Sequence, residues 1–465
     1  MDEEFDVIVI GGGPAGENVV GRCADGGLEV ALVEHELVGG ECSYWACIPS
    51  KTLIRPGDVL AAARRVPGAV EAVTGSLDAA AAFARRDYMV NNWSDASQAE
   101  WLESKSAVLV RGHGRLVDAR VVDVQVPDGS IRLRARRAVV LATGTSPAIP
   151  PIDSLREVSP WDNRDVTAAK ELPRRLLVLG GGTIGAEMAQ AFRRLGCEEV
   201  TVVEALDRLL ASEEPFAGEE VRAAFEAEGI TVIVGARMTA ARRDGSDSPV
   251  VATLADDREL VADEILVAVG RRPSTSDLGL DRVGLADKAG RYLDVDDQLR
   301  VQDVDGNWLY AVGDCNGRAL LTHMGKYHGR LCADVILGHD VTDVASNGIV
   351  SQVTFTDPQV CAVGFTEKQA RDRGLDVRVV SYGTGDVPGA YTLGEGVSGT
   401  SQLVVDERRR VVVGATFTGP GIQELLHSAT IAIAGAVTLD RLWHAVPAFP
   451  TVSEVWLHLL EAYGL

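Results

Sequence analysis

Two cysteines close together near the N-terminus could carry redox or metal chemistry. Cys42 and Cys47 are separated by four residues in the segment GGECSYWACIPSK, residues 39–51. An iron–sulfur pattern of the form C-x4-C-x2-C would need a third cysteine at position 50, where Ser50 stands. A zinc site would need further ligands at suitable spacing, and only His35 is close. A redox disulfide is therefore favoured over a metal site and over two buried free thiols.

A disulfide between these cysteines sets a condition on the backbone. Five residues of regular helix rise roughly 7.5 Å, whereas a disulfide needs Cα atoms within about 7 Å. We therefore expect a distorted segment, and Pro49 lies where a distortion would help. Glu41 precedes Cys42, and a nearby carboxylate would raise the pKa of the Cys42 thiol. Tyr44 and Trp45 either fill core space or shape the approach to Cys42.

A longer pattern occurs twice in the chain. The segment DVIVIGGGPAGENVVGRCADGGLEVALVE at 6–34 is matched by LLVLGGGTIGAEMAQAFRRLGCEEVTVVE at 176–204. Each copy predicts a strand, a glycine turn, a helix of small residues and a strand that ends in Glu. Both copies carry the G-x-G-x-x-G spacing and terminal acid of a dinucleotide site. The residues concerned are Gly11, Gly13, Gly16 and Glu34 in the first copy, and Gly180, Gly182, Gly185 and Glu204 in the second.

These two sites predict two nucleotides. The glycines let the backbone approach a pyrophosphate, the helix N-terminus attracts its charge, and the acid accepts hydrogen bonds from ribose hydroxyls. One nucleotide would be a nicotinamide donor, and the other a flavin that relays its electrons. Glu204 would repel a 2′-phosphate, which favours NADH, although Arg208 keeps NADPH open.

The length of 465 residues predicts two to four domains. After residue 345 the sequence alternates apolar and polar residues and then shows helical stretches, which indicates a separate α+β domain. The predicted fold class is therefore α/β, with two Rossmann-like dinucleotide-binding domains, for FAD and NAD, and a C-terminal α+β dimerisation domain.

Charge and composition exclude some partners. The formal net charge of −22 argues against nucleic acid and against anionic lipid surfaces. The acidic start MDEEFDVIVIGGG does not resemble a signal peptide, and no apolar run reaches about 18 residues. Seven cysteines, an odd number, do not form a secreted disulfide framework. We therefore predict a cytoplasmic protein without a metal site or a membrane partner.

The motifs, taken in order, resemble those of the pyridine nucleotide-disulfide oxidoreductases, such as lipoamide dehydrogenase, glutathione reductase and mercuric reductase. The resemblance covers nearly the whole chain. The motifs are GGGPAG (11–16), CSYWACIPSK (42–51), ATGTSP (142–147), GGGTIGAE (180–187), VGRRP (269–273), YAVGD (310–314), FTDPQVCAVGFTE (355–367) and FPTVSE (449–454).

The resemblance implies a domain order and a homodimer. It implies an FAD-binding domain at 1–150 and an NAD(P)-binding domain at 151–275. A central segment at 276–345 would complete the FAD site, and an interface domain would occupy 346–465. A mercuric reductase proper is not expected, because the sequence ends in Gly464-Leu465 and has no cysteine pair there to receive the metal.

The resemblance also implies roles for residues. Cys42 would exchange with substrate, Cys47 would face the flavin, and Lys51 and Glu187 would form an ion pair where nicotinamide stacks. FAD would be held by Gly11, Gly13, Pro14, Ala15, Gly16, Glu34, Gly40, Gly114, Thr143, Gly144, Asp314, Leu321 and Thr322. NAD would be held by Gly180, Gly182, Gly185, Glu204 and Gly270.

One departure from the family concerns the acid–base residue. The family carries His-x-His-Pro-Thr-x-Ser-Glu near its C-terminus, and the second His moves the proton. Here Phe449 occupies that position, while Glu454 remains as a catalytic residue without its imidazole. His444, five residues earlier, is a candidate substitute.

These observations predict an FAD-dependent NAD(P)H oxidoreductase that passes electrons through the cysteine pair to an atypical disulfide or other small acceptor. Because the base is missing, glutathione disulfide and lipoamide should be poor acceptors. The alternatives are a quinone or dye reductase in which the disulfide is secondary, and a flavoprotein that only binds a partner.

Overall fold

The structure is a computed structural model that describes residues 2–245 and 248–465. The chain forms two compact units, each assembled from three stretches. Unit 1 contains Met1–Pro49, Asp87–Pro147 and Arg271–Asn347, and unit 2 contains Ser50–Arg86, Ala148–Gly270 and Gly348–Leu465. Among the described residues, none of the helices combines the length and the apolar character that a membrane crossing needs.

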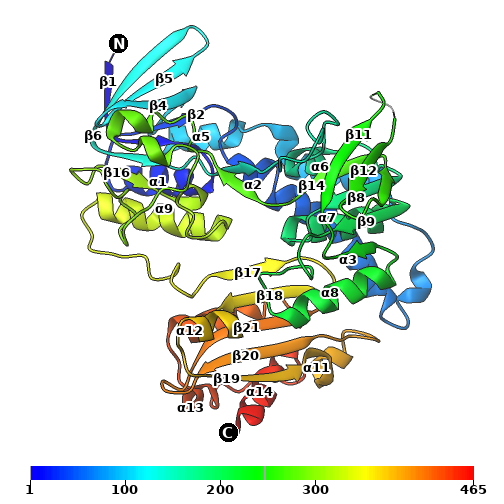
Figure 1. Ribbon diagram of the computed structural model, residues 1–465. Helices are drawn as coiled ribbons and strands as arrows, with labels where there is room; N and C mark the ends of the chain where they lie inside the picture. The colour runs from blue at the N-terminus through cyan, green and yellow to red at the C-terminus, as the bar shows by residue number, and fades with distance from the viewer. Residues whose placement is uncertain (1, 246–247) are drawn as a thin grey trace. The chain divides into compact units, whose positions relative to one another are not determined.

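Unit 1 is built on one sheet with the strand order β3-β2-β1-β6-β5-β4, and β16 pairs with β6. Strands β3, β2, β1, β6 and β16 run parallel, and β4, β5 and β6 form an antiparallel meander (Figure 1). The strands are β1 (Asp2–Ile10), β2 (Val30–Glu34), β3 (Val108–Arg111), β4 (His113–Asp118), β5 (Val121–Val126), β6 (Gly129–Leu141) and β16 (Leu309–Ala311), and the short pair is β7 (Thr145–Pro147) and β15 (Arg271–Pro273).

Burial explains the sequence of the central strand. Val7, Ile8 and Val9 of β1 are fully buried, because a parallel strand covered on both faces needs a continuous apolar run. Helices α1 and α9 pack against each other, with Gly325 and Gly329 close to Ala15 (Figure 1). The helices of this unit are α1 (Pro14–Asp25), α2 (Gly40–Tyr44), α5 (Ala96–Ser104) and α9 (Thr322–Ile336), and α3 (Cys47–Arg64) begins here and continues into unit 2.

Unit 2 contains the second copy of the repeat. Its parallel sheet has the order β10-β9-β8-β14, and an antiparallel sheet has the order β11-β12-β13. The strands are β8 (Arg175–Leu179), β9 (Glu199–Val203), β10 (Thr231–Ile233), β11 (Met238–Arg243), β12 (Val250–Leu254), β13 (Glu259–Ala262) and β14 (Glu264–Val267). The helices are α4 (Ala79–Met89), which crosses the unit boundary, α6 (Asn163–Ala168), α7 (Thr183–Leu195) and α8 (Pro215–Ala227). The unit β8–α7–β9 repeats β1–α1–β2, as the two copies of the sequence pattern predict.

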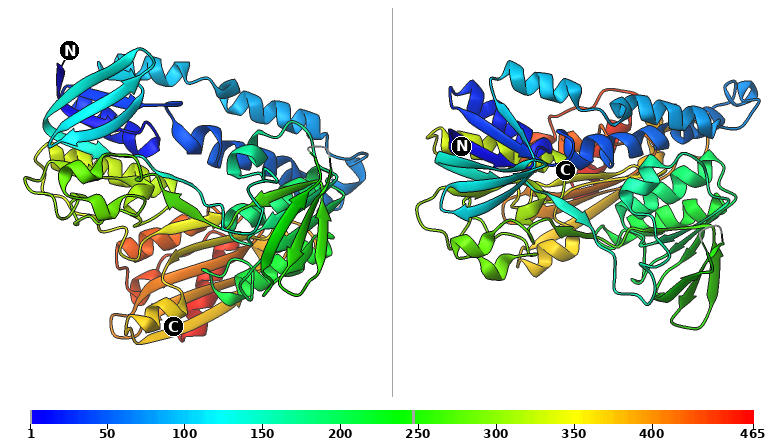
Figure 2. Two further views of the ribbon diagram at one scale, coloured as in Figure 1. Left: turned by 45° about the horizontal axis from the view of Figure 1, so that its top comes forward. Right: turned by 90° about the horizontal axis from the view of Figure 1, so that it is seen from above.

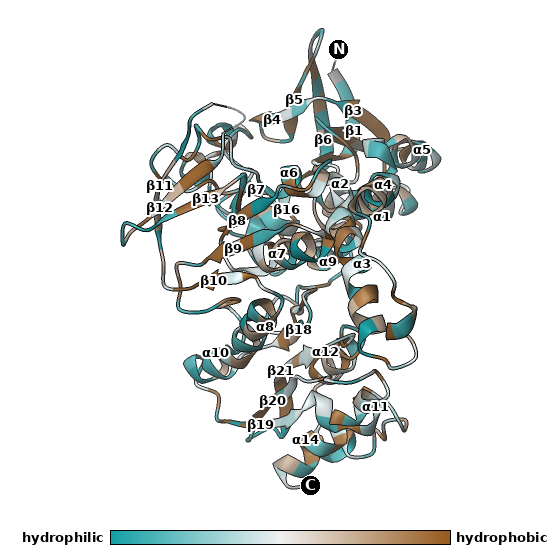
Figure 3. Cartoon of the chain, turned by 90° about the vertical axis from the view of Figure 1, so that its right-hand side faces the viewer, coloured by the Kyte–Doolittle hydropathy of each residue, from teal (hydrophilic) through white to brown (hydrophobic). Residues whose placement is uncertain are grey.

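The C-terminal part of unit 2 is an antiparallel sheet with the order β17-β18-β21-β20-β19. Helices α12 and α14 pack on this sheet (Figure 2). Strands β20 and β21 carry hydrophobic residues along much of their length, whereas α10 is hydrophilic (Figure 3). The elements are β17 (Ser351–Thr354), β18 (Gln359–Gly364), α10 (Glu367–Asp372), β19 (Val377–Gly383), α11 (Pro388–Tyr391), β20 (Thr400–Asp406), β21 (Val411–Gly419), α12 (Leu426–Ala434), α13 (Leu439–Leu442) and α14 (Val455–Tyr463).

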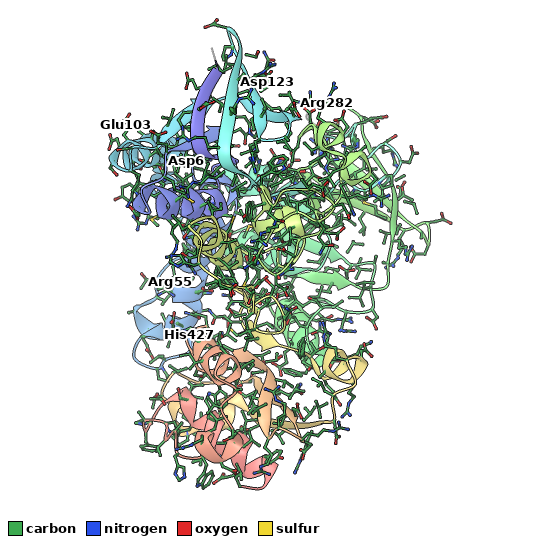
Figure 4. All side chains as sticks on the ribbon, turned by 90° about the vertical axis from the view of Figure 1, so that its left-hand side faces the viewer. Asp6, Arg55, Glu103, Asp123, Arg282 and His427 are labelled. Atoms are coloured by element: carbon green, nitrogen blue, oxygen red, sulfur yellow. The ribbon has the colours of Figure 1, made fainter. Side chains whose placement is uncertain are left out.

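The predicted fold class is confirmed: two nucleotide-type βαβ units and a C-terminal α+β sheet are present. The division into four domains stays a prediction. Charged side chains such as Glu103 and Arg282 lie at the surface of unit 1 (Figure 4).

Candidate active site

The two glycine turns have nearly the same geometry. Gly11 has φ +105° and Gly180 has φ +107°, a backbone conformation that favours glycine. A Cβ atom at Gly16 would collide with the Gly11 carbonyl, and one at Gly185 would collide with the Gly180 carbonyl. In each copy, glycine is therefore needed both for the turn and for the close packing of the helix on the strand.

The two acids are held in the same way. Glu34 accepts hydrogen bonds from the Gly12 N–H at 2.6 Å and the Glu36 N–H at 2.7 Å. Glu204 accepts equivalent bonds from the Gly181 N–H at 2.6 Å and the Leu206 N–H at 2.7 Å. Burial opposes ionisation of Glu34, but hydrogen bonds from His35 and from the two amides leave its pKa below the usual value.

The segment around the cysteines is distorted, as the sequence analysis predicts. Helix α2 ends at Tyr44, α3 begins at Cys47, and Trp45 has φ −138° between them. The expectation that Pro49 assists the distortion is wrong. Pro49 lies in the first turn of α3, where a missing N–H has no intrahelical acceptor. The break therefore precedes the proline.

The two thiols lie together at the start of α9. Cys42 and Cys47 are free thiols, and Cys47 is near enough to raise the pKa of Cys42. The Thr322 hydroxyl is 3.3 Å from the Cys47 Sγ. The hydrogen bond with Cys47 and then burial hold the pKa of Cys42 well above its usual value, while Thr322 and Lys326 act in the opposite direction.

Glu41 does not account for this shift. Its carboxylate is 3.2 Å from the Arg271 guanidinium, and Arg271 also donates to the Thr145 carbonyl at 2.7 Å. The Thr145 hydroxyl donates to the Asp314 carboxylate at 2.8 Å. Burial raises the pKa of Asp314, which Thr145 and Arg271 partly offset. The direction expected for Cys42 is therefore right, and the cause assigned to Glu41 is wrong.

The aromatic residues between the cysteines differ in their environment. Tyr44 is 2% exposed, and its hydroxyl donates to the Ser94 carbonyl at 3.3 Å. The Trp45 ring lies tilted on the Tyr44 ring, with 5.6 Å between centroids, and is partly exposed. Tyr44 therefore fills core space.

Lys51 and Glu187 form an ion pair in unit 2, as the resemblance implies. The Lys51 Nζ is 2.7 Å from the Glu187 carboxylate, which also accepts the Phe355 N–H at 2.9 Å. The Lys51 ammonium stands 4.9 Å from the centroid of the Phe355 ring. Lys51 lies four residues after Cys47 on α3, so one helix carries the second thiol and this cation.

The residues of unit 1 fit a dinucleotide. The Thr143 hydroxyl is buried and has no hydrogen-bond partner in the described part of the chain. A Cβ atom at Gly13 or Gly144 would meet nothing within 4 Å, so both backbones face open space. All thirteen residues predicted to hold FAD fall in the stretches of unit 1, and the five predicted to hold NAD fall in those of unit 2.

The C-terminal segment keeps an unpartnered carboxylate. Phe449 is 74% exposed. The Glu454 Oε2 is buried without a partner among residues 2–245 and 248–465. The His444 side chain is exposed, and no hydrogen bond joins it to Glu454 within those residues.

These features can be compared with known proteins. Residues 5–329 match the model of the pyridine nucleotide-disulphide oxidoreductase family, and residues 350–460 match the dimerisation domain of that family. The chain belongs to this family. Its members bind FAD and NAD(P)H, and the chain is an FAD-dependent NAD(P)H oxidoreductase.

Relatives extend over nearly the whole chain. The dihydrolipoyl dehydrogenase of Chlamydia pneumoniae is 31% identical over 98% of this chain and 96% of its own. The mercuric reductase of Shigella flexneri is 32% identical over 97% of this chain and 78% of its own. Among solved structures, LpdA from Mycobacterium tuberculosis has a TM-score of 0.87 at 25% identity and covers 100% of both chains. The flavoprotein disulfide reductase RclA from Escherichia coli, at 24% identity and a TM-score of 0.86 over 99% of both chains, shares the fold.

Sequence reasoning missed several residues around the thiols. Arg271 and Thr145 join Glu41 and Asp314, and Lys326 influences Cys42. Thr145 lies within the motif ATGTSP and Arg271 within VGRRP, so both could have been found by considering every polar residue of these motifs. Lys326 lies outside every motif and could not have been found in this way.

Proposed function

We propose that the protein passes two electrons from NADH, with bound FAD as the relay, to the Cys42–Cys47 pair, which then reduces an external disulfide. The observation that carries this proposal is the contact of the two thiols with each other and with Thr322. The five other cysteines are buried, and burial raises the pKa of each of their thiols. The pair is thus the natural place for reversible two-electron storage.

The residues that would hold the cofactors divide between the units. In unit 1, Gly11, Gly13, Gly16 and Glu34 would bind the ADP half of FAD, and Thr143 and Asp314 would bind its remaining polar groups. FAD, when bound, supplies the two-electron chemistry that side chains lack. In unit 2, Gly180, Gly182, Gly185 and Glu204 would bind NADH.

The environment of Glu204 supports NADH over NADPH. A 2′-phosphate would meet the Glu204 carboxylate, which two amides hold in place. Arg208 does not turn toward that carboxylate. Its guanidinium donates to the Ala211 carbonyl at 2.9 Å and lies 3.3 Å from Asp207.

The chemistry of the thiol pair is thiol–disulfide exchange. The Cys42 thiolate attacks one sulfur of the acceptor, forms a mixed disulfide and releases the first acceptor thiolate. The Cys47 thiolate then attacks the Cys42 sulfur, releases the second acceptor thiolate and forms the Cys42–Cys47 disulfide. The two protons of the original dithiol end on the two released thiols, so one disulfide is reduced for each one formed.

A second candidate function is supported by Phe449. A phenyl ring cannot donate the proton that a leaving thiolate needs, which favours quinones or dyes as acceptors. Such acceptors would take electrons without the cysteine pair.

The C-terminal segment supports a homodimer, because it matches a dimerisation domain and exposes several apolar side chains.

An anaerobic titration with NADH tests the proposal. The oxidised holoenzyme should take up two electrons more per FAD than a simple flavoprotein does, because the cysteine pair also accepts two. In Cys42→Ser this extra capacity should disappear, and disulfide reduction should fall by at least about 100-fold, while NADH still bleaches the flavin. If the variant reduces disulfides as fast as the natural protein, the quinone or dye reductase is the better assignment.

A further inference from the structure

A completely buried histidine of unit 1 takes no part in the chemistry proposed above. His328 lies in α9 and is 0% exposed. A buried imidazole needs partners for both of its ring nitrogens, because an unpaired polar group is costly away from water. The partners of the two nitrogens therefore indicate what this side chain does.

One ring nitrogen faces a buried amide. The Nδ1 atom of His328 is 3.4 Å from the side-chain Nδ2 of Asn316. The same Nδ2 donates to the Ala311 carbonyl at 3.1 Å, and the Asn316 Oδ1 accepts the Arg318 N–H at 3.0 Å. These bonds fix the amide with its NH₂ group toward the ring. Because an NH₂ group of an amide only donates, Nδ1 is the acceptor, and the proton of the neutral ring lies on Nε2.

The other ring nitrogen anchors the imidazole. The Nε2 atom of His328 is 2.9 Å from the Ser346 Oγ and 3.5 Å from the Asp343 carboxylate. Asp343 also accepts the Ser346 N–H at 3.0 Å and pairs with Arg318 at 2.7 Å. Burial raises the pKa of this carboxyl, but hydrogen bonds from His328, Ser346 and Arg318 bring it well below its usual value. A charged, immobile acceptor thus holds the N–H side of the ring in one orientation.

The amide on Nδ1 belongs to the turn that carries Asp314. This turn is the short helix η5 (Gly313–Asn316), which follows β16. At Gly313, φ is +71° and an added Cβ would lie 3.1 Å from the Cβ of Ala15, so the turn passes close to the start of α1. Only one residue separates Asn316 from Asp314. A shift of the amide would therefore also shift the Asp314 carboxylate.

We propose that His328 is a positioning residue for FAD: its Nδ1 holds Asn316, and with it the turn that presents Asp314, against α9. Ser346 and Asp343 orient the ring so that Nδ1 faces the amide. This inference rests on the role proposed above for Asp314 in binding FAD. The effect of the histidine on the cofactor is indirect, and it should appear in how firmly FAD is held.

Two variants separate the two sides of the imidazole. Asparagine places an amide oxygen near the position of Nδ1, whereas glutamine places an amide nitrogen near the position of Nε2. His328→Asn should therefore keep the contact with Asn316, and His328→Gln should keep only the contacts with Ser346 and Asp343. The two replacements are similar in size and polarity, so each is the control for the other.

Release of FAD from the diluted holoenzyme is the measurement, followed by the fluorescence of the freed cofactor. His328→Gln should release FAD about five- to tenfold faster than the natural protein, the effect of one lost buried hydrogen bond. His328→Asn should stay within about twofold of the natural rate, because it keeps that bond. His339→Gln changes an exposed histidine just after α9 and should release FAD at the natural rate. A His328→Gln protein purified without FAD would support the proposal, and a His328→Asn protein purified without FAD would contradict it.

Two further measurements distinguish positioning from a general loss of structure. With FAD in excess, the KM for NADH should be the same in both variants, because the residues proposed to bind NADH lie in unit 2. Asn316→Ala should release FAD at least as fast as His328→Gln. Combining these two changes should add less than about twofold, because the effects of residues in contact are not additive.

The outcomes separate this inference from the assignments on which it rests. Equal release rates for His328→Asn and His328→Gln would overturn it, because packing of the ring and not its Nδ1 would then matter, and additive effects with Asn316→Ala would overturn it too. If Asp314→Asn retains FAD as firmly as the natural protein, the role of Asp314 is wrong and the inference falls with it. If Asp314→Asn releases FAD quickly but His328→Gln does not, only the inference is wrong. The exchange at Cys42 is tested separately by the NADH titration.

Discussion

At the scale of single residues, Phe449 stands where the family resemblance implies an acid–base histidine. Its ring is 74% exposed and close in sequence to Glu454, whose buried Oε2 has no partner in the described residues. An imidazole placed here would have a carboxylate available to orient it.

Restoring the imidazole should restore proton transfer. We expect Phe449→His to increase kcat/KM for glutathione disulfide by at least about tenfold, because general acid–base catalysis is typically worth about 10²–10⁴-fold. The gain should follow an ionisation near pH 6.5, the usual range of a histidine. Steady-state kinetics between pH 5.5 and 8.5 would measure it.

Phe449→Leu is the matched control, since it changes the size of the side chain without adding a proton carrier. It should give no gain. 5,5′-Dithiobis(2-nitrobenzoate), whose thiolate leaves without a proton, should not benefit from the histidine either. An equal gain in the leucine variant would assign the effect to steric access.

At the scale of elements, helix α7 holds the turn before β18. Gln190 accepts the Asp357 N–H at 2.7 Å and donates to the Asp357 carbonyl at 2.9 Å. Arg194, one turn later, pairs with the Asp357 carboxylate at 2.8 Å and with Glu228 at 2.6 Å. Burial opposes the charge of Asp357, yet Arg194 and Arg65 bring its pKa below the usual value. The same helix carries Glu187, which pairs with Lys51 at 2.7 Å.

Removing Arg194 should leave Asp357 charged, buried and under-compensated. We expect Arg194→Met to lower the free energy of unfolding by about 3–5 kcal/mol. Because the folded pKa of Asp357 is lowered, its contribution is present above the unfolded value of about 3.9 and is lost as the pH falls. The variant should therefore lose less stability than the natural protein between pH 5 and pH 3. Denaturant unfolding at several pH values would measure both effects.

Arg222→Met provides the comparison, since Arg222 makes an exposed pair with Glu226 on α8. That change should cost less than about 1 kcal/mol. Equal losses in the two variants would contradict the role assigned to the buried network.

The elements also explain which parts of the fold could be predicted. The two strand–helix–strand units could be predicted from the local spacing of the glycines. Each glycine is required by close contacts within its own segment. The break in the helix at Trp45 could be predicted from the largest Cα–Cα distance that a disulfide allows. The influence of Lys326 on Cys42 could not be predicted, because the two residues lie on different helices, α9 and α2, that are far apart in the sequence. Glu41 shows the same limit: its partner Arg271 is 230 residues away.

At the scale of the whole molecule, the C-terminal segment exposes a cluster of large apolar side chains. Val446 is 84% exposed, Phe449 is 74% exposed and Trp443 is 40% exposed, all within seven residues. Clusters of this kind mark association surfaces. The match of this region to a dimerisation domain supports the same interpretation.

A charge in this cluster should weaken the homodimer. We expect the natural protein to have about twice the 49.4 kDa mass of one chain, and Val446→Asp to shift it toward the monomer. Light scattering coupled to gel filtration at low micromolar concentration would measure the masses. Val261→Asp, at another exposed apolar position, should stay dimeric. A monomeric natural protein would contradict the proposed assembly.

The paired glycine amides have a spectroscopic consequence. The Gly12 and Gly181 N–H groups each donate to a carboxylate at 2.6 Å, which makes both hydrogen bonds charge-assisted. Their protons should be strongly deshielded and should appear as two resolved downfield signals in an amide NMR spectrum. NADH should move the Gly181 signal, whereas release of FAD should move the Gly12 signal. The internal repeat thus supplies the molecule with its own pair of occupancy reporters, one for each nucleotide.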